Sequence, residues 1–219
     1  KQFVESVDES FENKVITNGD FVINDDFSYA GKMETSLTEG SNPYYAFKAD
    51  STYAKSLISG GISGKDIAGT ELINSAQFRT LARMTVDAKK PAREQAGYIF
   101  WEIPVNKSGV EGWRINYLLP DRISPFELPS TVDEEYSYTI TIPVNSQLIN
   151  PVEMTELESG FGSLVLSTQQ KGNKVTVKRM LVIRQQLISP DEYQDLKEMM
   201  DLWNDKNYRQ LVLKKAANP

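Results

Sequence analysis

Cysteine and histidine are both missing from the 219-residue chain. Without a thiol the chain has no cysteine nucleophile and no disulfide. Without an imidazole it lacks the usual general base near neutral pH. A Ser-His-Asp relay and nearly every zinc or transition-metal site are therefore excluded for its own residues. Carboxylate, Ser-Lys or Tyr chemistry and oxygen-only calcium sites are left.

Long apolar runs and long basic runs are also missing. No apolar run approaches the ~20 residues that cross a bilayer, so we expect no membrane insertion. The formal net charge is −6, and a negative protein repels phosphate backbones, so nucleic acid is not an expected partner. The chain begins at Lys1 and not at Met, which we interpret as a fragment or a mature product.

Segments rich in β-branched and aromatic residues recur along the whole chain and predict roughly ten strands. Strict alternation over residues 136–142 indicates a strand with one buried face. Asn18-Gly19 predicts a type I′ hairpin, and Gly31 is expected at a bulge or bend. Residues 113–119 are expected to form a strand that pairs with the strand at 98–103.

Residues 160–213 predict strand, turn, strand, helix and strand. Ser189, Pro190 and Glu192 form the pattern of a capped helix start, with Ser189 and Glu192 as a capping box. One helical face then carries the large apolar side chains Tyr193, Leu196, Met199, Met200 and Trp203. Leu211–Leu213 is expected to be an edge strand.

These patterns predict a mainly β fold, either an antiparallel β-sandwich or a large twisted sheet. A C-terminal amphipathic helix and a final edge strand complete it. We expect one β-rich domain over residues 1–219, or two lobes at 1–120 and 121–219. The seam between them would be the proline-dense segment 120–129 (PDRISPFELP).

Four aromatic residues are the candidate ligand contacts, because exposed rings bind sugars by stacking: Tyr44, Tyr45, Trp101 and Trp113. Aromatic side chains are also favoured in strands, so sheet core is the competing interpretation. We predict no catalytic residue, no metal site and no cofactor. A glycan-binding or adhesion module nevertheless remains an alternative function.

Three groups of acids could supply calcium ligands or a glycosidase pair: Asp25-Asp26, Asp133-Glu134-Glu135, and Glu153, Glu156 and Glu158. None has an EF-hand spacing, so we interpret them as solvated turns. Residues 59–66 (SGGISGKD) resemble a phosphate-binding loop only superficially. Asp66 stands where that loop needs Ser or Thr, so we interpret the segment as the loop that ends a helix.

An ordered set of turn and scaffold motifs occurs over residues 122–215. In chain order these are Arg122-x-x-Pro125-Phe126, Tyr136-x-Tyr138-x-Ile140-x-Ile142-Pro143, Gly160-x-Gly162-Ser163, Gly172-Asn173-x-Val175-x-Val177-x-Arg179, Ile188-x-Pro190-x-Glu192-Tyr193 and Leu211-Val212-Leu213-Lys214-Lys215. This set resembles the β-rich domain that follows a transglutaminase-like core in large exported proteins of certain Gram-negative gut anaerobes.

The resemblance implies a periplasmic, cell-envelope or extracellular setting in a bacterium. It also implies a parent protein with a papain-like Cys-His-Asp core, which cannot lie in a chain without Cys and His. We therefore expect a non-enzymatic accessory domain. Its partner would be the upstream catalytic domain of the same protein or an envelope protein.

Overall fold

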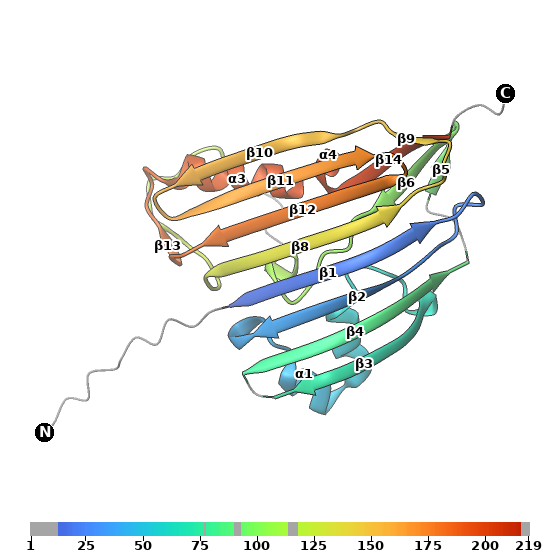
Figure 1. Ribbon diagram of the computed structural model, residues 1–219. Helices are drawn as coiled ribbons and strands as arrows, with labels where there is room; N and C mark the ends of the chain where they lie inside the picture. The colour runs from blue at the N-terminus through green and yellow to red at the C-terminus, as the bar shows by residue number, and fades with distance from the viewer. Residues whose placement is uncertain (1–12, 77, 90–92, 114–117, 216–219) are drawn as a thin grey trace, which may run out of the picture.

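The computed structural model describes residues 13–76, 78–89, 93–113 and 118–215. In these ranges, eight strands form one large sheet in the order β10–β11–β12–β8–β1–β2–β4–β3 (Figure 1). Their bounds are β1 Lys14–Ile23, β2 Tyr29–Thr38, β3 Ile67–Ser75, β4 Arg79–Ala88, β8 Val132–Thr141, β10 Val152–Ser159, β11 Gly162–Lys171 and β12 Lys174–Ile183. Neighbouring strands are antiparallel except β1 and β8, which run parallel. The sheet is therefore mixed and not purely antiparallel.

Two smaller sheets and four α-helices complete the described fold. A four-stranded sheet has the order β5–β6–β14–β9, and β13 pairs with β7. The strand bounds are β5 Arg93–Gln95, β6 Tyr98–Glu102, β7 Phe126–Glu127, β9 Ser146–Leu148, β13 Leu187–Ile188 and β14 Gln210–Lys215. The helices are α1 Tyr44–Ala49, α2 Ser51–Ile58, α3 Tyr193–Asn204 and α4 Lys206–Arg209, with short 3-10 turns at η1 Glu39–Ser41, η2 Gly64–Asp66 and η3 Val110–Trp113. The prediction of a mainly β fold with a large sheet, a C-terminal helix and a final strand is confirmed.

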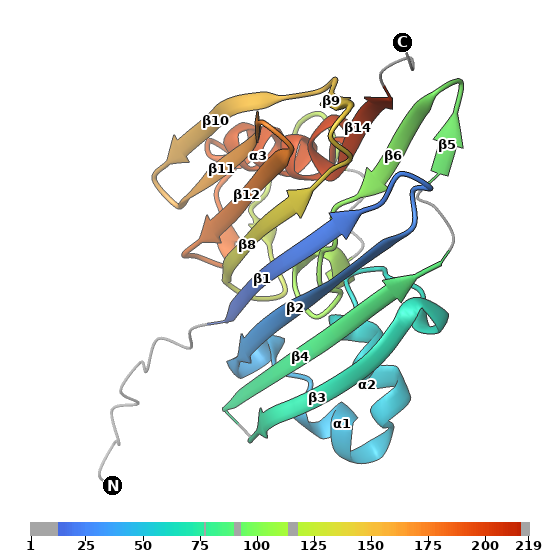
Figure 2. The ribbon, with the colours of Figure 1, turned by 45° about the vertical axis from the view of Figure 1, so that its right-hand side comes forward.

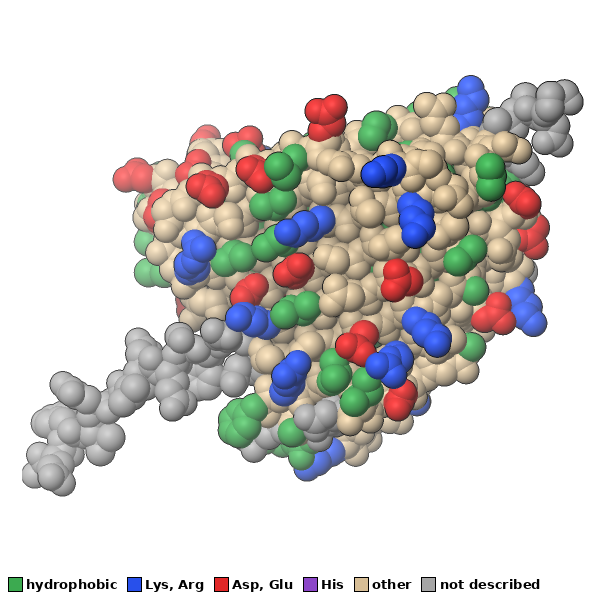
Figure 3. Space-filling view, in the orientation of Figure 1, with side chains coloured by type: hydrophobic (Ala, Val, Ile, Leu, Met, Phe, Trp, Pro, Cys, Tyr) green, Lys and Arg blue, Asp and Glu red, His purple; other side chains and the backbone are tan. Residues whose placement is uncertain are grey.

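The helices and the four-stranded sheet lie on one face of the large sheet (Figure 2). The side chains of the strands are buried on this covered face and more exposed on the other. Along β8, for example, every second residue is buried, as the alternation over 136–142 predicted. The other face of the large sheet carries lysines, arginines, acids and single hydrophobic side chains, scattered without a large patch of one kind (Figure 3). The core therefore lies between the large sheet and the elements behind it.

The predicted hairpin at Asn18-Gly19 is wrong, because β1 runs straight through both residues. A Cβ on Gly19 would lie only 2.8 Å from Cδ1 of Tyr138, so glycine leaves room for that ring on the neighbouring strand. The chain reverses later, where the Phe27 N–H donates to the Asn24 carbonyl at 2.8 Å. Phe27 has a φ of 66° in this turn.

The bulge expected at Gly31 is also wrong. Gly31 pairs with Phe21 in a ladder without a register shift. A Cβ at Gly31 would lie 2.3 Å from the Asp20 carbonyl oxygen. The glycine therefore permits a close approach of two backbones within a regular strand pair.

Helix α3 begins at Tyr193, three residues after the predicted start at Pro190. The Glu192 N–H donates to the Ser189 carbonyl at 3.2 Å, so the first turn closes with an i→i+3 bond. Only half of the capping box forms. The Glu192 carboxylate accepts from the Ser189 N–H at 3.2 Å and from its hydroxyl at 2.8 Å. The predicted buried face is confirmed for all five of its residues: Tyr193, Leu196, Met199, Met200 and Trp203.

The final strand is not an edge strand. β14 pairs with β6 on one side and with β9 on the other. β14 also takes the place beside β6 that residues 113–119 were expected to fill. Trp113 is the last residue of the turn η3 (Val110–Trp113), and residues 114–117 lie outside the described ranges.

The parallel pair of β1 and β8 joins segments from both sides of the proline-dense segment 120–129 in one sheet. That segment contains β7, which pairs with β13. The division into one domain or two lobes stays a prediction.

Candidate functional site

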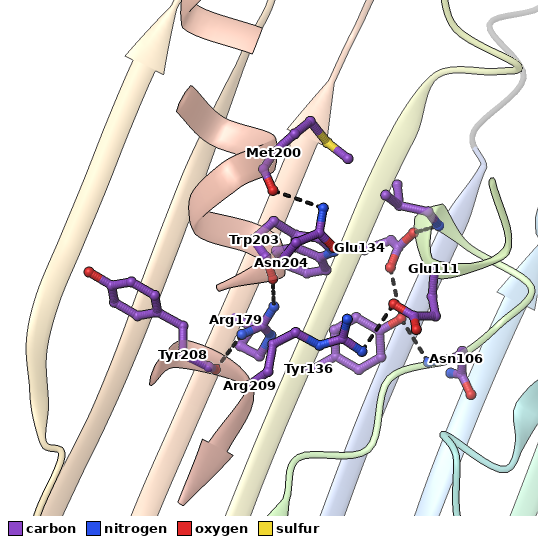
Figure 4. A network of polar contacts seen from close by, with 11 residues as sticks. Asn106, Glu111, Glu134, Tyr136, Arg179, Met200, Trp203, Asn204, Tyr208 and Arg209 are labelled. Carbon is purple, nitrogen blue, oxygen red and sulfur yellow. Dashed lines mark hydrogen bonds and ion pairs between the residues drawn. The ribbon is translucent and has the colours of Figure 1, made fainter. Parts of the chain in front are cut away.

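A network of buried polar side chains lies between the large sheet and the corner of α3 and α4 (Figure 4). Glu134 and Tyr136 come from β8, and Arg179 comes from the adjacent strand β12. Each of the three is at most 2% exposed. Strand register sets their proximity, because Arg179 is directly opposite Tyr136. Period-two alternation then turns all three side chains toward the same side.

Both carboxylate oxygens of Glu134 accept hydrogen bonds from inside the fold. Oε1 accepts from the Val110 N–H at 2.5 Å, and Oε2 accepts from the Tyr136 hydroxyl at 2.7 Å. Burial raises the pKa of Glu134 to about 7, although these hydrogen bonds and the charge of Arg179 act in the opposite direction. A Cβ at Gly109 would lie 2.1 Å from Oε1, so the loop 106–113 can pass this close only with glycine there.

The same loop is tied to the sheet by Asn106. The main-chain N–H of Asn106 donates to the Tyr136 hydroxyl oxygen at 3.2 Å, and its side-chain Nδ2 donates to Oγ1 of Thr17 at 2.7 Å. The hydroxyl oxygen of Thr17 lies 3.0 Å from the hydroxyl oxygen of Thr35. The network therefore links the loop to β1, β2 and β8, of which β8 is distant in sequence from the other two, and it holds the loop in place.

Arg179 is a buried cation whose partners are main-chain carbonyls. Its Nη2 donates to the Trp203 carbonyl at 2.7 Å, and its Nη1 donates to the Tyr208 carbonyl. The guanidinium carbon also lies 4.3 Å from the centre of the Trp203 ring. These carbonyls belong to the end of α3 and to α4, where a helix leaves its acceptors unpaired and attracts positive charge.

Burial, together with the nearby charge of Arg209, lowers the pKa of Arg179 to about 10, so it keeps its proton at neutral pH. The arrangement therefore joins elements. Arg179 fastens the C-terminal corner to the sheet with two charge-assisted hydrogen bonds.

A polar cleft of about 520 Å³ lies beside the network. Its charged lining consists of the cations Arg93, Lys107, Lys206 and Arg209 and the anions Glu102 and Glu111. Nη2 of Arg209 lies 3.0 Å from Oε2 of Glu111, and Figure 4 shows this pair next to Arg179. Across the described ranges, no group of three or more His, Cys, Asp or Glu side chains could hold a metal ion.

The predicted ligand-contact aromatics lie in different surroundings. Tyr45 is 67% exposed, and its ring lies 5.4 Å from that of Tyr44, which is half-buried. Trp113 is half-buried against the core. The prediction that Trp101 contacts a ligand is wrong, because its side chain is only 2% exposed and its ring centre lies 5.3 Å from that of Phe21. Its position on β6 turns it inward, so it offers no stacking surface. Ligand binding at the other three stays a prediction.

The acid groups also divide. Asp26 fits the solvated-turn interpretation, since its carboxylate accepts from the Ser28 hydroxyl at 2.6 Å, which lowers its pKa. Glu134 contradicts it, because it lies inside β8 and faces the core. Continuing the period of two backward from Tyr136 would have predicted this orientation. The glycines Gly60 and Gly61, both at positive φ, end α2 as expected.

Some motif residues of the sequence resemblance meet in space. The guanidinium carbon of Arg122 lies 4.9 Å from the Phe126 ring centre and 5.8 Å from that of Tyr193. The two rings are themselves 6.0 Å apart. The motifs around 122–126 and 188–193 therefore describe one stacked contact that joins the proline-dense segment to the start of α3.

Comparisons with known proteins identify the family. No curated protein matches the chain. The crystal structure of a "putative protease" from Parabacteroides distasonis ATCC 8503 is similar in fold, with a TM-score of 0.50 and 20% sequence identity. The similarity covers 64% of this chain but only 31% of that protein. In the part of the chain that the structure describes, no helix has the length and apolarity needed to cross a membrane.

The family model for a domain of unknown function with a solved structure, DUF3858, matches residues 97–213. This stretch is more than half of the 219 residues and contains Glu134, Tyr136 and Arg179. The chain therefore belongs to the DUF3858 family.

Proposed function

We propose that this chain is a non-catalytic accessory domain of a longer bacterial envelope protein with a transglutaminase-like or peptidase-like core. It would pack on that core or on a surface partner in the periplasm or outside the cell. The ordered motifs over 122–215 support the transglutaminase-like setting. The fold similarity, which covers 31% of the longer Parabacteroides distasonis protein, supports a role within a larger chain.

The burial and hydrogen bonding of Glu134 are the observation that carries the proposal. A catalytic acid must reach the proton that it moves on a substrate. Glu134 is 2% exposed, and both of its oxygens are bonded to the loop at Val110 and to Tyr136. Glu134, whose pKa burial raises to about 7, therefore holds a loop on a sheet and does not face a substrate.

Enzyme assays of the purified chain test the absence of catalysis. We expect no hydrolysis of casein or fluorogenic peptides and no incorporation of amines into a glutamine-containing protein. Turnover that is abolished by Glu111→Gln or Glu102→Gln would overturn the proposal, because these two acids line the cleft. Lys32→Gln, on the open face of the large sheet, is the matched control.

The partner is tested by reading the gene upstream of the codon for Lys1 and expressing the encoded segment separately. We expect a Cys-His-Asp core that co-elutes with this chain in gel filtration. An upstream segment without such a core would contradict the transglutaminase-like setting.

A glycan-binding module is the second candidate, and the exposed aromatics of α1 and α2 favour it. Tyr45 and Tyr53 are 67% and 57% exposed, and Nζ of Lys48 lies 4.3 Å from the centre of the Tyr44 ring. A glycan array read with wild type, Tyr45→Ala and Trp113→Ala separates the candidates. Binding that is lost in either variant would favour the module.

A further inference from the structure

We propose that the cleft beside the buried network binds a ligand that carries carboxylates, such as a short acidic peptide. This inference is independent of the accessory role. It rests on the charges that separate elements bring together around one cavity of a protein that is negative overall.

Four cations line the cleft, and they come from three separate parts of the chain. Arg93 lies in β5, Lys107 in the loop before η3, Lys206 at the start of α4, and Arg209 at its end. Glu102 and Glu111 are the acids in the lining, so its formal charge is +2 from four cations and two anions. The whole chain carries −6, so the cleft concentrates positive charge against the sign of the molecule.

The lysines of the cleft are its free charges. Lys107 and Lys206 are exposed and make no ion pair with any described carboxylate. Arg93 stacks on Phe100, with its guanidinium carbon 4.8 Å from the ring centre, and this contact leaves its N–H groups open to a ligand.

Arg179 adds a fixed positive charge behind the cleft. It is 1% exposed and bonded to the Tyr208 carbonyl, next to Arg209. Water cannot screen a buried charge well, so its field acts on the nearby cavity. Glu134, in the same buried network with a pKa of about 7, offsets part of this charge at neutral pH, so the four cations of the lining carry the proposal.

Carboxylates are favoured over other anions because one already sits in the cleft. Glu111 holds Arg209 at 3.0 Å, with side chains 28% and 30% exposed. An arginine fork matches the planar carboxylate geometrically. A ligand carboxylate can join or replace Glu111 there while a second one meets the lysines. The volume of about 520 Å³ lies within the range of small-ligand sites, roughly 300–1,000 Å³.

Isothermal titration of the whole chain with the dipeptide Glu-Glu tests the proposal, with Gln-Gln as the neutral probe. We expect Glu-Glu to bind, Gln-Gln not to bind, and the affinity to fall as salt is raised. Lys107→Gln and Lys206→Gln should each raise the Kd for Glu-Glu about fivefold, the size expected from the loss of one partly exposed charge contact. Both lysines are exposed, so neither change removes core packing.

Two further variants separate a real site from general charge attraction. Glu111→Gln should lower the Kd for Glu-Glu several-fold, since it removes the carboxylate that competes with the ligand for Arg209. Lys32→Gln, an exposed lysine of β2 on the open sheet face, should leave Kd unchanged. Equal weakening by Lys32→Gln, binding of Gln-Gln, or no heat with Glu-Glu would overturn the proposal. Inorganic phosphate that binds as tightly as Glu-Glu would overturn the choice of carboxylate.

Discussion

Glu134 shows at the scale of a residue how burial sets a pH dependence. Its pKa is about 7 in the fold because burial disfavours the charged form, whereas its ordinary value is 4.5. The folded state therefore holds the proton more tightly than the unfolded state. The resulting stability is fully present below pH 4.5 and is lost as the pH rises through about 7.

We expect Glu134→Gln to remove this dependence, since glutamine resembles the protonated acid. Between pH 4.5 and 7 the unfolding free energy of wild type should fall by roughly 3 kcal/mol relative to the variant. Urea unfolding of both proteins at a series of pH values measures the difference. All other acids are shared, so their titration cancels. Parallel curves would mean that the carboxyl is not buried as described.

At the scale of an element, β1 depends on Gly19, because only a residue without a side chain leaves room for the ring of Tyr138. A Cβ there would lie 2.8 Å from Tyr138 and 3.0 Å from Phe21, and both rings are buried. We expect Gly19→Ala to lower the unfolding free energy by about 1–3 kcal/mol, the usual cost of overpacking.

Gly69→Ala is the control for Gly19→Ala, since no atom lies within 4 Å of a Cβ at Gly69 in β3. Denaturant unfolding of the pair should separate steric cost from the general effect of replacing glycine in a strand. Equal effects of the two changes would contradict the tight contact at Tyr138.

Helix α3 is anchored to the sheet by Trp203. The side chain is 1% exposed, and its ring centre lies 6.0 Å from that of Tyr136 and 4.3 Å from the guanidinium carbon of Arg179. We expect Trp203→Ala to cost about 3–5 kcal/mol because it leaves a cavity and exposes the buried cation's surroundings. Circular dichroism melts would show this as a lower Tm.

Glu198→Ala is the comparison for Trp203→Ala, because Glu198 lies on the exposed side of the same helix. Alanine suits a helix, so this change should alter the unfolding free energy little. A Tm that is unchanged in Trp203→Ala would mean that the helix does not dock through its indole.

At the scale of the whole molecule, the parallel pair of β1 and β8 connects the two halves of the chain. The network around Asn106 reinforces that connection, since it bonds to Thr17 of β1 and Tyr136 of β8. We expect the chain to unfold in one cooperative transition, with equal calorimetric and van't Hoff enthalpies in differential scanning calorimetry. Two transitions, with Trp203→Ala lowering only one of them, would instead indicate two lobes at 1–120 and 121–219.

Local patterns predicted what depends on neighbours in sequence. Alternation identified β8, and helical spacing identified the buried face of α3, because side-chain direction in a strand or helix follows from backbone geometry alone. The absence of thiol and imidazole likewise excluded whole classes of chemistry before any fold was known. Even the orientation of Glu134 was contained in the alternation around Tyr136.

Contacts between distant segments decided the rest. Asn18-Gly19 has the composition of a turn, but the Tyr138 ring, more than a hundred residues away, makes it a strand. Leu211–Leu213 became an inner strand only because β6 and β9 lie on its two sides. The cleft joins cations whose spacing in sequence carries no pattern. The amino-acid sequence by itself determined the alternation of β8, the buried face of α3 and which chemistry is excluded. Only the tertiary structure decided which strands pair and where the charges gather, because those depend on packing between remote parts of the chain.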